Sequence, residues 1–342
     1  MENILGYNKD ELKSWLKASG LKPFRADQIL QWIFDHGATG FDQMTNLSKL
    51  DRDVLSESLE IYSSEVAEVL KCHDGTVKLL LKWPDGALTE TVLMFHGDGR
   101  RTVCISSQVG CPVGCSFCAS GLDGLQRSLT AAEMIEQVMW ARQQLDDEER
   151  ISNVVLMGMG EPFANYQNVI DAIGVINSAD GINIGARHIT VSTVGVPHNI
   201  RNLAAQPLQI TLAISLHAAS DELRQQLIPW AKTYKLLEVF GAVDDYYNET
   251  HREVTLEYVM LEGVNCREAD SRKLARWAID YRCNVNLINY NPVKGVDFQP
   301  ASKATVDKFM NSLTRQGVNV HLRKSKGGKI AAACGQLRKR HL

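Results

Sequence analysis

The chain has 342 residues, of which 44% are hydrophobic and 23% charged, a composition typical of a soluble globular protein with one large and one smaller domain. No apolar run reaches the roughly 20 residues needed to cross a bilayer, and residues 1–10 are too polar for a signal peptide. We therefore expect a cytoplasmic protein with no membrane partner, whose eight cysteines are reduced rather than paired in a disulfide framework.

The first 99 residues predict two small units. Apolar residues recur at helical spacing in 9–18 and 25–36, and 50–59 is a third helical candidate, so we expect a helical domain over 1–65. Residues 67–92 alternate as strands do and contain the turn signals Asp74-Gly75 and Asp85-Gly86. This pattern predicts a β-rich connector over 66–99.

From about residue 100 the pattern alternates between strand and helix. Strands are expected at 102–107, 152–157, 188–192, 210–216, 254–260 and 285–290, and helices at 131–145, 166–178, 236–247, 268–281 and 303–316. Six strands joined by helices predict a parallel sheet within 100–325, either open or partly closed into a barrel. In such sheets the chemistry lies at the carboxyl ends of the strands.

A CxxxCxxC motif, formed by Cys111, Cys115 and Cys118, follows the first of these strands. Thiolates are the usual protein ligands of iron–sulfur clusters, and three ligands on a four-iron cube leave one iron open to a substrate. The alternatives are a zinc site that lacks a ligand, or three unconnected thiols. Because a structural zinc site normally has four ligands and the nearest histidine, His96, is not adjacent, we favour a cluster.

Polar motifs follow other strands of the predicted sheet. The glycine-rich segment 158–162 follows the second strand, Ser192 and Ser215 with His217 end the third and fourth, and Asn291 follows the sixth. Each motif alone is explained equally well as a turn or as a hydrogen-bonded structural residue. Their shared position at one edge of the sheet, opposite the cysteine loop, predicts a bound ligand.

Charge is distributed unevenly along the chain. Residues 293–342 contain eleven Lys or Arg and two Asp or Glu, a net charge of +9, whereas the preceding 292 residues sum to −12. Basic groups at 323–326 and 338–340 flank Cys334. Such a segment is either a solvated tail or a surface for a polyanion such as RNA.

Longer segments resemble the RlmN/Cfr family of radical S-adenosylmethionine (SAM) RNA adenosine methyltransferases. The matching segments are CISSQVGC (104–111), LMGMGEP (156–162), ISLHA (214–218), EYVML (257–261), NLINYNP (286–292) and AACGQL (332–337). Residues 24–33 are similar to that family's small helical domain. The resemblance implies an α/β fold, a partial (β/α)6 radical-SAM barrel at 100–325, with an RNA-contacting domain at 1–65 and a basic segment at 326–342.

The resemblance also implies the site residues. Cys111, Cys115 and Cys118 would ligate a [4Fe–4S] cluster. The SAM site would be lined by Gly160, Glu161, Ser192, Ser215, Leu216, His217 and Asn291. Cys334 matches a cysteine that becomes methylated, and Cys104 matches one that forms a transient disulfide with it. Glu90 matches a glutamate described as a proton acceptor, although one extra residue separates it from Cys104.

The implied reaction uses two SAM molecules per turnover, because C2 of adenine is electron-poor and cannot displace a methyl group from a sulfonium. One SAM methylates Cys334. The second is cleaved by an electron from the cluster, and the resulting radical takes a hydrogen from the S-methyl group. The methylene radical adds to the ring carbon, and loss of the ring proton with attack by Cys104 on Cys334 releases the product and leaves a disulfide.

The resemblance implies methylation of an adenosine in the peptidyl-transferase region of 23S ribosomal RNA, at either C2 or C8, and some C2 members of the family also act on transfer RNA. The Gly-Glu-Pro form of residues 160–162 favours C2. An external electron donor such as flavodoxin and a monomeric state are expected. Pro-Trp-Ala at 229–231 and Ala-Ser-Gly at 119–121 depart from the family's usual residues and bear on RNA docking. Two alternatives stay open: C8 methylation of the same adenosine, and a metal-containing RNA-binding or redox-sensing protein without catalysis.

Overall fold

One ten-stranded sheet runs through the computed structural model, which describes residues 1–146 and 148–338. Its strand order is β14-β13-β12-β11-β10-β9-β6-β5-β4-β3. The antiparallel part consists of β3 (Glu65–Lys71), β4 (Val77–Lys82) and β5 (Leu88–Phe95), and β5 pairs with β6 (Arg101–Cys104). The parallel part continues from β6 through β9 (Asn153–Leu156), β10 (Ile189–Thr193), β11 (Thr211–Ser215), β12 (Val254–Met260), β13 (Cys283–Asn289) and β14 (Val320–Arg323).

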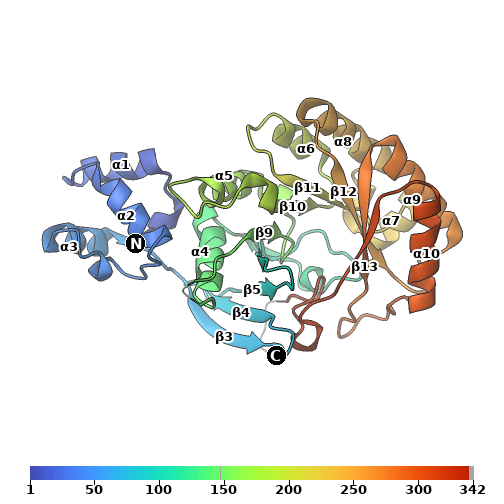
Figure 1. The fold of residues 1–342 in the computed structure, drawn as a ribbon, viewed down its shortest axis with the longest axis horizontal. Coiled ribbons are helices and arrows are strands. Elements are labelled where there is room, and N and C mark those ends of the chain that lie inside the picture. Colours follow the sequence, from blue (N-terminus) through green and yellow to red (C-terminus); the bar gives the residue numbers. More distant parts are fainter. Residues whose placement is uncertain (147, 339–342) are drawn as a thin grey trace.

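Helices connect the parallel strands and cover the outer face of the sheet (Figure 1). They are α4 (Ala131–Arg142), α5 (Tyr166–Asn177), α6 (Pro197–Ala204), α7 (Asp221–Leu227), α8 (Leu236–Thr250), α9 (Glu268–Asp280) and α10 (Lys303–Arg315). The last helix shows the general pattern: Ser302 caps its first turn, and Val306, Phe309 and Leu313 form its buried stripe. This arrangement is the expected parallel sheet with helices on its outer face.

The parallel part has one strand more than the six predicted from the sequence. The additional strand, β14, is short and carries His321 and Arg323, and its Leu322 is 43% exposed, so it lacks an apolar signature. The first predicted strand, 102–107, is shorter than expected. It ends at Cys104: Ile105 N–H makes the last ladder bond, to Val155 O, and Ser107 N–H then donates to Met159 O, beyond the end of β9. No helix in the described part of the chain is long and apolar enough to span a membrane.

Three short helices form a separate group at the N-terminal side (Figure 1). They are α1 (Lys9–Ala18), α2 (Arg25–Phe34) and α3 (Lys49–Ser58), close to the predicted ranges. A two-residue parallel pairing of β1 (Glu2–Asn3) with β2 (Leu59–Glu60) joins the two ends of this group. The two ends of the helical group therefore lie side by side, next to α4.

Glu136 of α4 holds this junction together. Its carboxylate is completely buried and accepts hydrogen bonds from Ser63 N–H (3.1 Å), Ser64 N–H (2.7 Å), both serine hydroxyls and Asn3 Nδ2 (3.0 Å). Burial of a carboxylate is unfavourable unless donors surround it. These donors all come from the residues that flank the helical group, so Glu136 fixes that group to the barrel.

Replacing Glu136 with Ala should destabilise the protein by about 3 kcal/mol or more, because several buried donors lose their partner together. Urea unfolding and limited proteolysis around residues 61–65 would measure this change. The control is Glu249→Ala on the exposed side of α8, which should shift stability by less than about 0.5 kcal/mol. Equal unfolding curves for the two variants would contradict the assigned role of Glu136.

Candidate active site

Two cavities lie one above the other inside the barrel. Side chains of a strand alternate between two faces, so the inward residues of each strand appear at two levels. At the carboxyl ends, Ser192, Ser215 and His217 line a cavity of about 140 Å³, which we call the cysteine cavity. Nearer the amino ends, Thr190, Thr211, Thr255 and Asn286 line a cavity of about 680 Å³, which we call the large cavity.

Cys111, Cys115 and Cys118 all line the cysteine cavity. Their loop, residues 111–124, is called the cysteine loop. It is closed at its base by the hairpin of β7 (Gln108–Gly110) and β8 (Leu125–Ser128). The backbone of Gly110 has φ +80°, and a Cβ atom there would lie 1.9 Å from the carbonyl oxygen of Gly124. Only glycine allows the two arms of the hairpin to approach this closely.

The donor set fits an iron–sulfur cluster better than zinc. Across residues 1–146 and 148–338, no three His, Cys, Asp or Glu side chains converge on a single metal-ion position. A cube takes its thiolates at separate corners, whereas zinc draws four ligands to one point. All eight cysteines are free, and burial raises the pKa of Cys111 to about 12, so metal binding must displace its proton.

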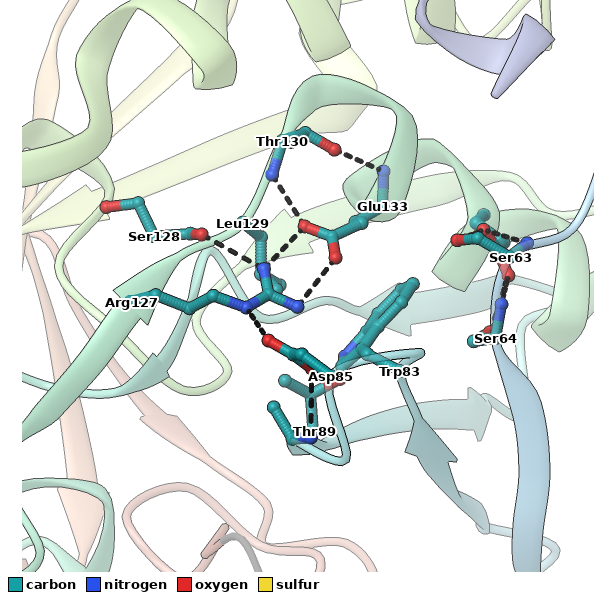
Figure 2. A network of polar contacts seen from close by, with 12 residues as sticks. Ser63, Ser64, Trp83, Asp85, Thr89, Arg127, Ser128, Leu129, Thr130 and Glu133 are labelled. Carbon is teal, nitrogen blue, oxygen red and sulfur yellow. Dashed lines mark hydrogen bonds and ion pairs between the residues drawn. The ribbon is translucent and has the colours of Figure 1, made fainter. Parts of the chain in front are cut away.

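Arg127 braces the hairpin from outside, as Figure 2 shows. Its Nε donates to Asp85 Oδ2 (2.5 Å) in the β4–β5 turn, and its Nη1 and Nη2 donate to the two oxygens of Glu133 (2.9 and 2.8 Å). Glu133 also accepts from Thr130 N–H in the capping box that begins α4. The Arg127 guanidinium is the main cause of the lowered pKa of Asp85. The hairpin below the cysteines is therefore tied to both the β4–β5 turn and α4.

The glycine-rich segment after β9 forms the next wall of the cysteine cavity. Gly160 has φ +109°, and a Cβ there would lie 2.7 Å from Ser107 Oγ. Glu161 is buried, and its two oxygens accept from Phe163 N–H (2.9 Å) and Val194 N–H (2.8 Å). Burial raises the pKa of Glu161, and these hydrogen bonds oppose that rise. The Glu161 carboxylate thus fixes the backbone at Phe163 and at Val194, in two loops beside the cysteine cavity.

His217 is held in a single tautomer. Its Nδ1 accepts from Val259 N–H (3.1 Å), and burial lowers its pKa to about 3, so the ring is neutral and the proton is on Nε2. Ser192 Oγ and Ser215 Oγ are 2.9 Å apart. These three residues offer a neutral, polar wall opposite the cysteines, suited to a small polar cofactor.

Two predicted ligand residues lie elsewhere. The Leu216 side chain is completely buried and lines neither cavity, while its N–H donates to Glu257 O (3.0 Å). Asn291 lines the large cavity, and its Nδ2 donates to Cys334 O (3.4 Å). The structure therefore gathers five of the seven predicted SAM residues around the cysteine cavity.

Residues 327–338, which we call the strap, carry Cys334 across the barrel. Gly327 N–H donates to Asp74 Oδ2 (3.1 Å) at the start of the strap. Gly335 O accepts from Ala119 N–H (2.8 Å), and Leu337 O accepts from Ser120 Oγ (2.7 Å), both from the cysteine loop. The predicted basic segment continues beyond the strap, and its residues 339–342 lie outside the described residues.

Cys334 is exposed and lines both cavities, whereas Cys104 is buried and lines the large cavity. Burial raises the pKa of Cys104 to about 12, and the nearby Cys334 adds to this rise. The two thiols predicted to react with one another therefore lie in the same cavity, with Cys334 facing the other cysteines as well.

Glu90 anchors the end of the strap. One oxygen is 2.6 Å from Lys78 Nζ, and the other accepts from Arg338 N–H (2.6 Å). The Arg338 side chain also forms an ion pair with Asp123. Burial raises the pKa of Glu90 and Lys78 opposes the rise. The carboxylate lines neither cavity in this structure.

Two charged residues at this site had no predicted role, although Glu257 begins the matching segment 257–261 and Arg323 belongs to the basic group 323–326. Glu257 and Arg323 each line both cavities, together with Cys334. A signal for Glu257 is present in the sequence, because it occupies the inward register of β12 between Thr255 and Val259. Arg323 lies on the unpredicted strand β14, and its signal in the sequence is its membership of the basic group 323–326.

Comparisons with known proteins identify the same two parts of the chain. A family model described as "Ribosomal RNA large subunit methyltransferase N-terminal domain" matches residues 2–61, and one described as "Radical SAM superfamily" matches residues 105–275. The "Probable dual-specificity RNA methyltransferase RlmN" of Rhodopirellula baltica is 44% identical over 98% of this chain and 91% of its own length. The protein of that name from Clostridium novyi is 41% identical over 100% and 99%.

A solved structure has almost the same fold. The "radical SAM methyltransferase from Sphaerobacter thermophilus" superposes with a TM-score of 0.96 and is 42% identical, and the match covers 99% of each chain. The similarity therefore extends through the N-terminal helices, the barrel and the strap rather than being confined to the cysteine motif.

Gly110→Ala should abolish most cluster binding, because the added methyl group collides with the Gly124 carbonyl and opens the base of the cysteine loop. Iron and sulfide content after anaerobic reconstitution would measure the loss. Gly317→Ala is the matched control: φ is similar at +86°, but no neighbouring atom lies within 4 Å of the added Cβ. Equal iron content in the two variants would show that the close approach at Gly110 is not required.

Proposed function

Because the chain belongs to the RlmN family of radical SAM RNA methyltransferases, we propose that it methylates C2 of an adenosine in the peptidyl-transferase region of 23S ribosomal RNA. We include transfer RNA as a second substrate, in keeping with the dual-specificity name of its relatives. The methyl group would pass through an S-methylated Cys334. The observation that carries this proposal is the position of Cys334 between two cavities.

The two cavities suit two different ligands. The cysteine cavity has the cluster ligands and the small polar groups expected around SAM. The large cavity is wide enough for a nucleobase, and Arg100, Lys324 and Lys326 line it together with Arg323. Cationic side chains at such a cavity attract RNA phosphates, which favours entry of a base that has left its stack. A thiol that faces both cavities can accept a methyl group from one and deliver carbon to the other.

The residues around the cysteine cavity hold the cofactors in this proposal. Cys111, Cys115 and Cys118 would bind a [4Fe–4S] cluster, which supplies the electron that cleaves SAM. Gly160, Glu161, Ser192, Ser215 and His217 would surround SAM, with Leu216 and Asn291 contributing from their flanking positions. Two SAM molecules would be used per turnover, the first of which methylates Cys334 with loss of the thiol proton.

Cys104 and Glu90 would complete the reaction. After the ring carbon has been bonded, Cys104 would lose its proton and attack the sulfur of Cys334, which breaks the carbon–sulfur bond and forms a disulfide. The released carbon would take up a proton to become the methyl group, and the remaining unpaired electron would return to the cluster. Because the pKa of Cys104 is raised, formation of its thiolate requires a nearby cation. Arg323 lies close enough to Cys104 to oppose the rise in pKa. Glu90 would accept the ring proton, and for that it must first exchange its hydrogen bond with Arg338 N–H.

Parts of the chain away from the barrel complete the proposal. The helical unit at 1–65 would contact RNA, the connector at 66–99 would support the strap, and the basic segment at 326–342 would bind phosphates. A monomeric enzyme would receive electrons from an external donor such as flavodoxin. The oxidised cysteine pair would need reduction before the next turnover.

Cys334→Ala should abolish methylation of RNA, because no thiol remains between the cavities. Cys104→Ala should still acquire a methyl group on Cys334 yet release no methylated RNA, because Cys104 acts only in the last step. Mass spectrometry of the protein and of the RNA would separate the two steps. Undiminished RNA methylation by the Cys334 variant would exclude the proposed intermediate.

Ribosomal and transfer RNA from cells with and without the protein should differ in 2-methyladenosine. Nucleoside mass spectrometry distinguishes this product from 8-methyladenosine, which would instead show that C8 is the target. An unchanged adenosine pattern in both RNA classes would refute methyltransferase activity and favour a binding or redox-sensing role.

A further inference from the structure

Five residues line both cavities and form the wall between them. They are Met157, Glu257, Ile288, Arg323 and Cys334. Glu257 and Arg323 are the charged side chains among these five, and the reaction proposed above assigns no direct contact with the base to either. The Glu257 side chain is 4% exposed and that of Arg323 is 30% exposed. An acceptor and a donor therefore lie together beside the thiol that would deliver carbon.

The contacts within the protein leave both groups with unused hydrogen-bonding capacity. Glu257 accepts from Asn286 Nδ2 (3.0 Å) and from Arg323 Nη1 (3.3 Å). The same Arg323 nitrogen lies 3.3 Å from Met157 Sδ. A carboxylate has about four acceptor positions and a guanidinium has five N–H donors. These contacts occupy two acceptor positions of Glu257 and one guanidinium nitrogen of Arg323.

The ion pair between Glu257 and Arg323 is longer than a strong charged hydrogen bond. Strong charged hydrogen bonds have donor–acceptor distances of about 2.7–2.9 Å, and the Lys78–Glu90 contact at 2.6 Å is at least as short. The Glu257–Arg323 contact is longer, and buried ion pairs with imperfect geometry contribute little to stability. A ligand that uses the remaining capacity of both groups explains why they are kept at a cavity wall.

We propose that Glu257 and Arg323 recognise the target base and select adenine. Glu257 accepts a hydrogen bond from the 6-amino group, and Arg323 donates to the adjacent ring nitrogen. Along this edge of adenine the amino group, the ring nitrogen and C2 follow one another, so binding the first two brings C2 towards Cys334. Guanine presents O6 and a protonated N1 in the same places and is repelled by the carboxylate. This assignment rests on the proposed function, because it requires an adenosine substrate.

The test compares two RNA stem–loops that differ only at the target nucleotide, which is adenosine in one and purine riboside in the other. Purine riboside lacks the 6-amino group, and its ring is no less electron-poor, so a slower reaction reports recognition rather than reactivity. We expect the wild-type enzyme to favour adenosine by about tenfold or more in kcat/KM. Glu257→Ala should remove this preference, and Glu257→Gln, which keeps one acceptor oxygen, should retain part of it.

A closely matched control lies beside the same pair of strands. Glu253 is exposed immediately before β12 and accepts from Asn284 Nδ2 (2.8 Å), as Glu257 does from Asn286, but it lines neither cavity. Glu253→Ala should keep the wild-type preference. Equal use of the two RNAs by the wild-type enzyme, or an unchanged preference in Glu257→Ala, would overturn the reading role. Absence of methylation on adenosine itself would overturn the proposed function instead.

Discussion

The position of Cys334 depends on backbone hydrogen bonds that hold the strap across the barrel. Asp74 fixes the start of the strap, Ala119 and Ser120 hold its middle, and Glu90 fixes its end. All four partners bind main-chain groups of the strap, at 327, 335, 337 and 338, so they fix its path whatever its side chains are. The cavities alone do not define the site, because the thiol that connects them is placed by the antiparallel part of the sheet, β3 to β5, and by the cysteine loop.

Four buried carboxylates illustrate how the same unfavourable burial is resolved in different ways. Glu136 and Glu161 accept mainly from backbone and hydroxyl donors, and both fix loops in place. Glu90 combines a lysine with a backbone N–H at the end of the strap. Glu257 differs because its charged partner is more distant and a cavity adjoins it on each side. The first three are satisfied within the protein, and the fourth is poised for a ligand.

The sequence indicates the parts of the site that depend on local pattern. Cysteine spacing, strand alternation and the motifs at strand ends predict the cysteine loop, the six main strands and the placement of Ser192, Ser215 and His217. The rest depends on contacts between distant segments. Strand β14 has no apolar signature and forms by pairing with β13. Lys78 and Arg338 reach Glu90 only in the folded chain, and the charged wall of Glu257 and Arg323 arises where β12 and β14 flank β13.

The strap joins residues that are far apart in the chain: Asp74 and Gly327 are separated by 253 positions, and Glu90 and Arg338 by 248. Domains form progressively from the N-terminus during synthesis. Every strand of the barrel has therefore left the ribosome before the strap emerges, so the cysteine loop can fold while Cys334 is still inside the exit tunnel. Translation itself sets the order of assembly, and a chain interrupted before the strap lacks the thiol and the strap residues that complete the walls of both cavities.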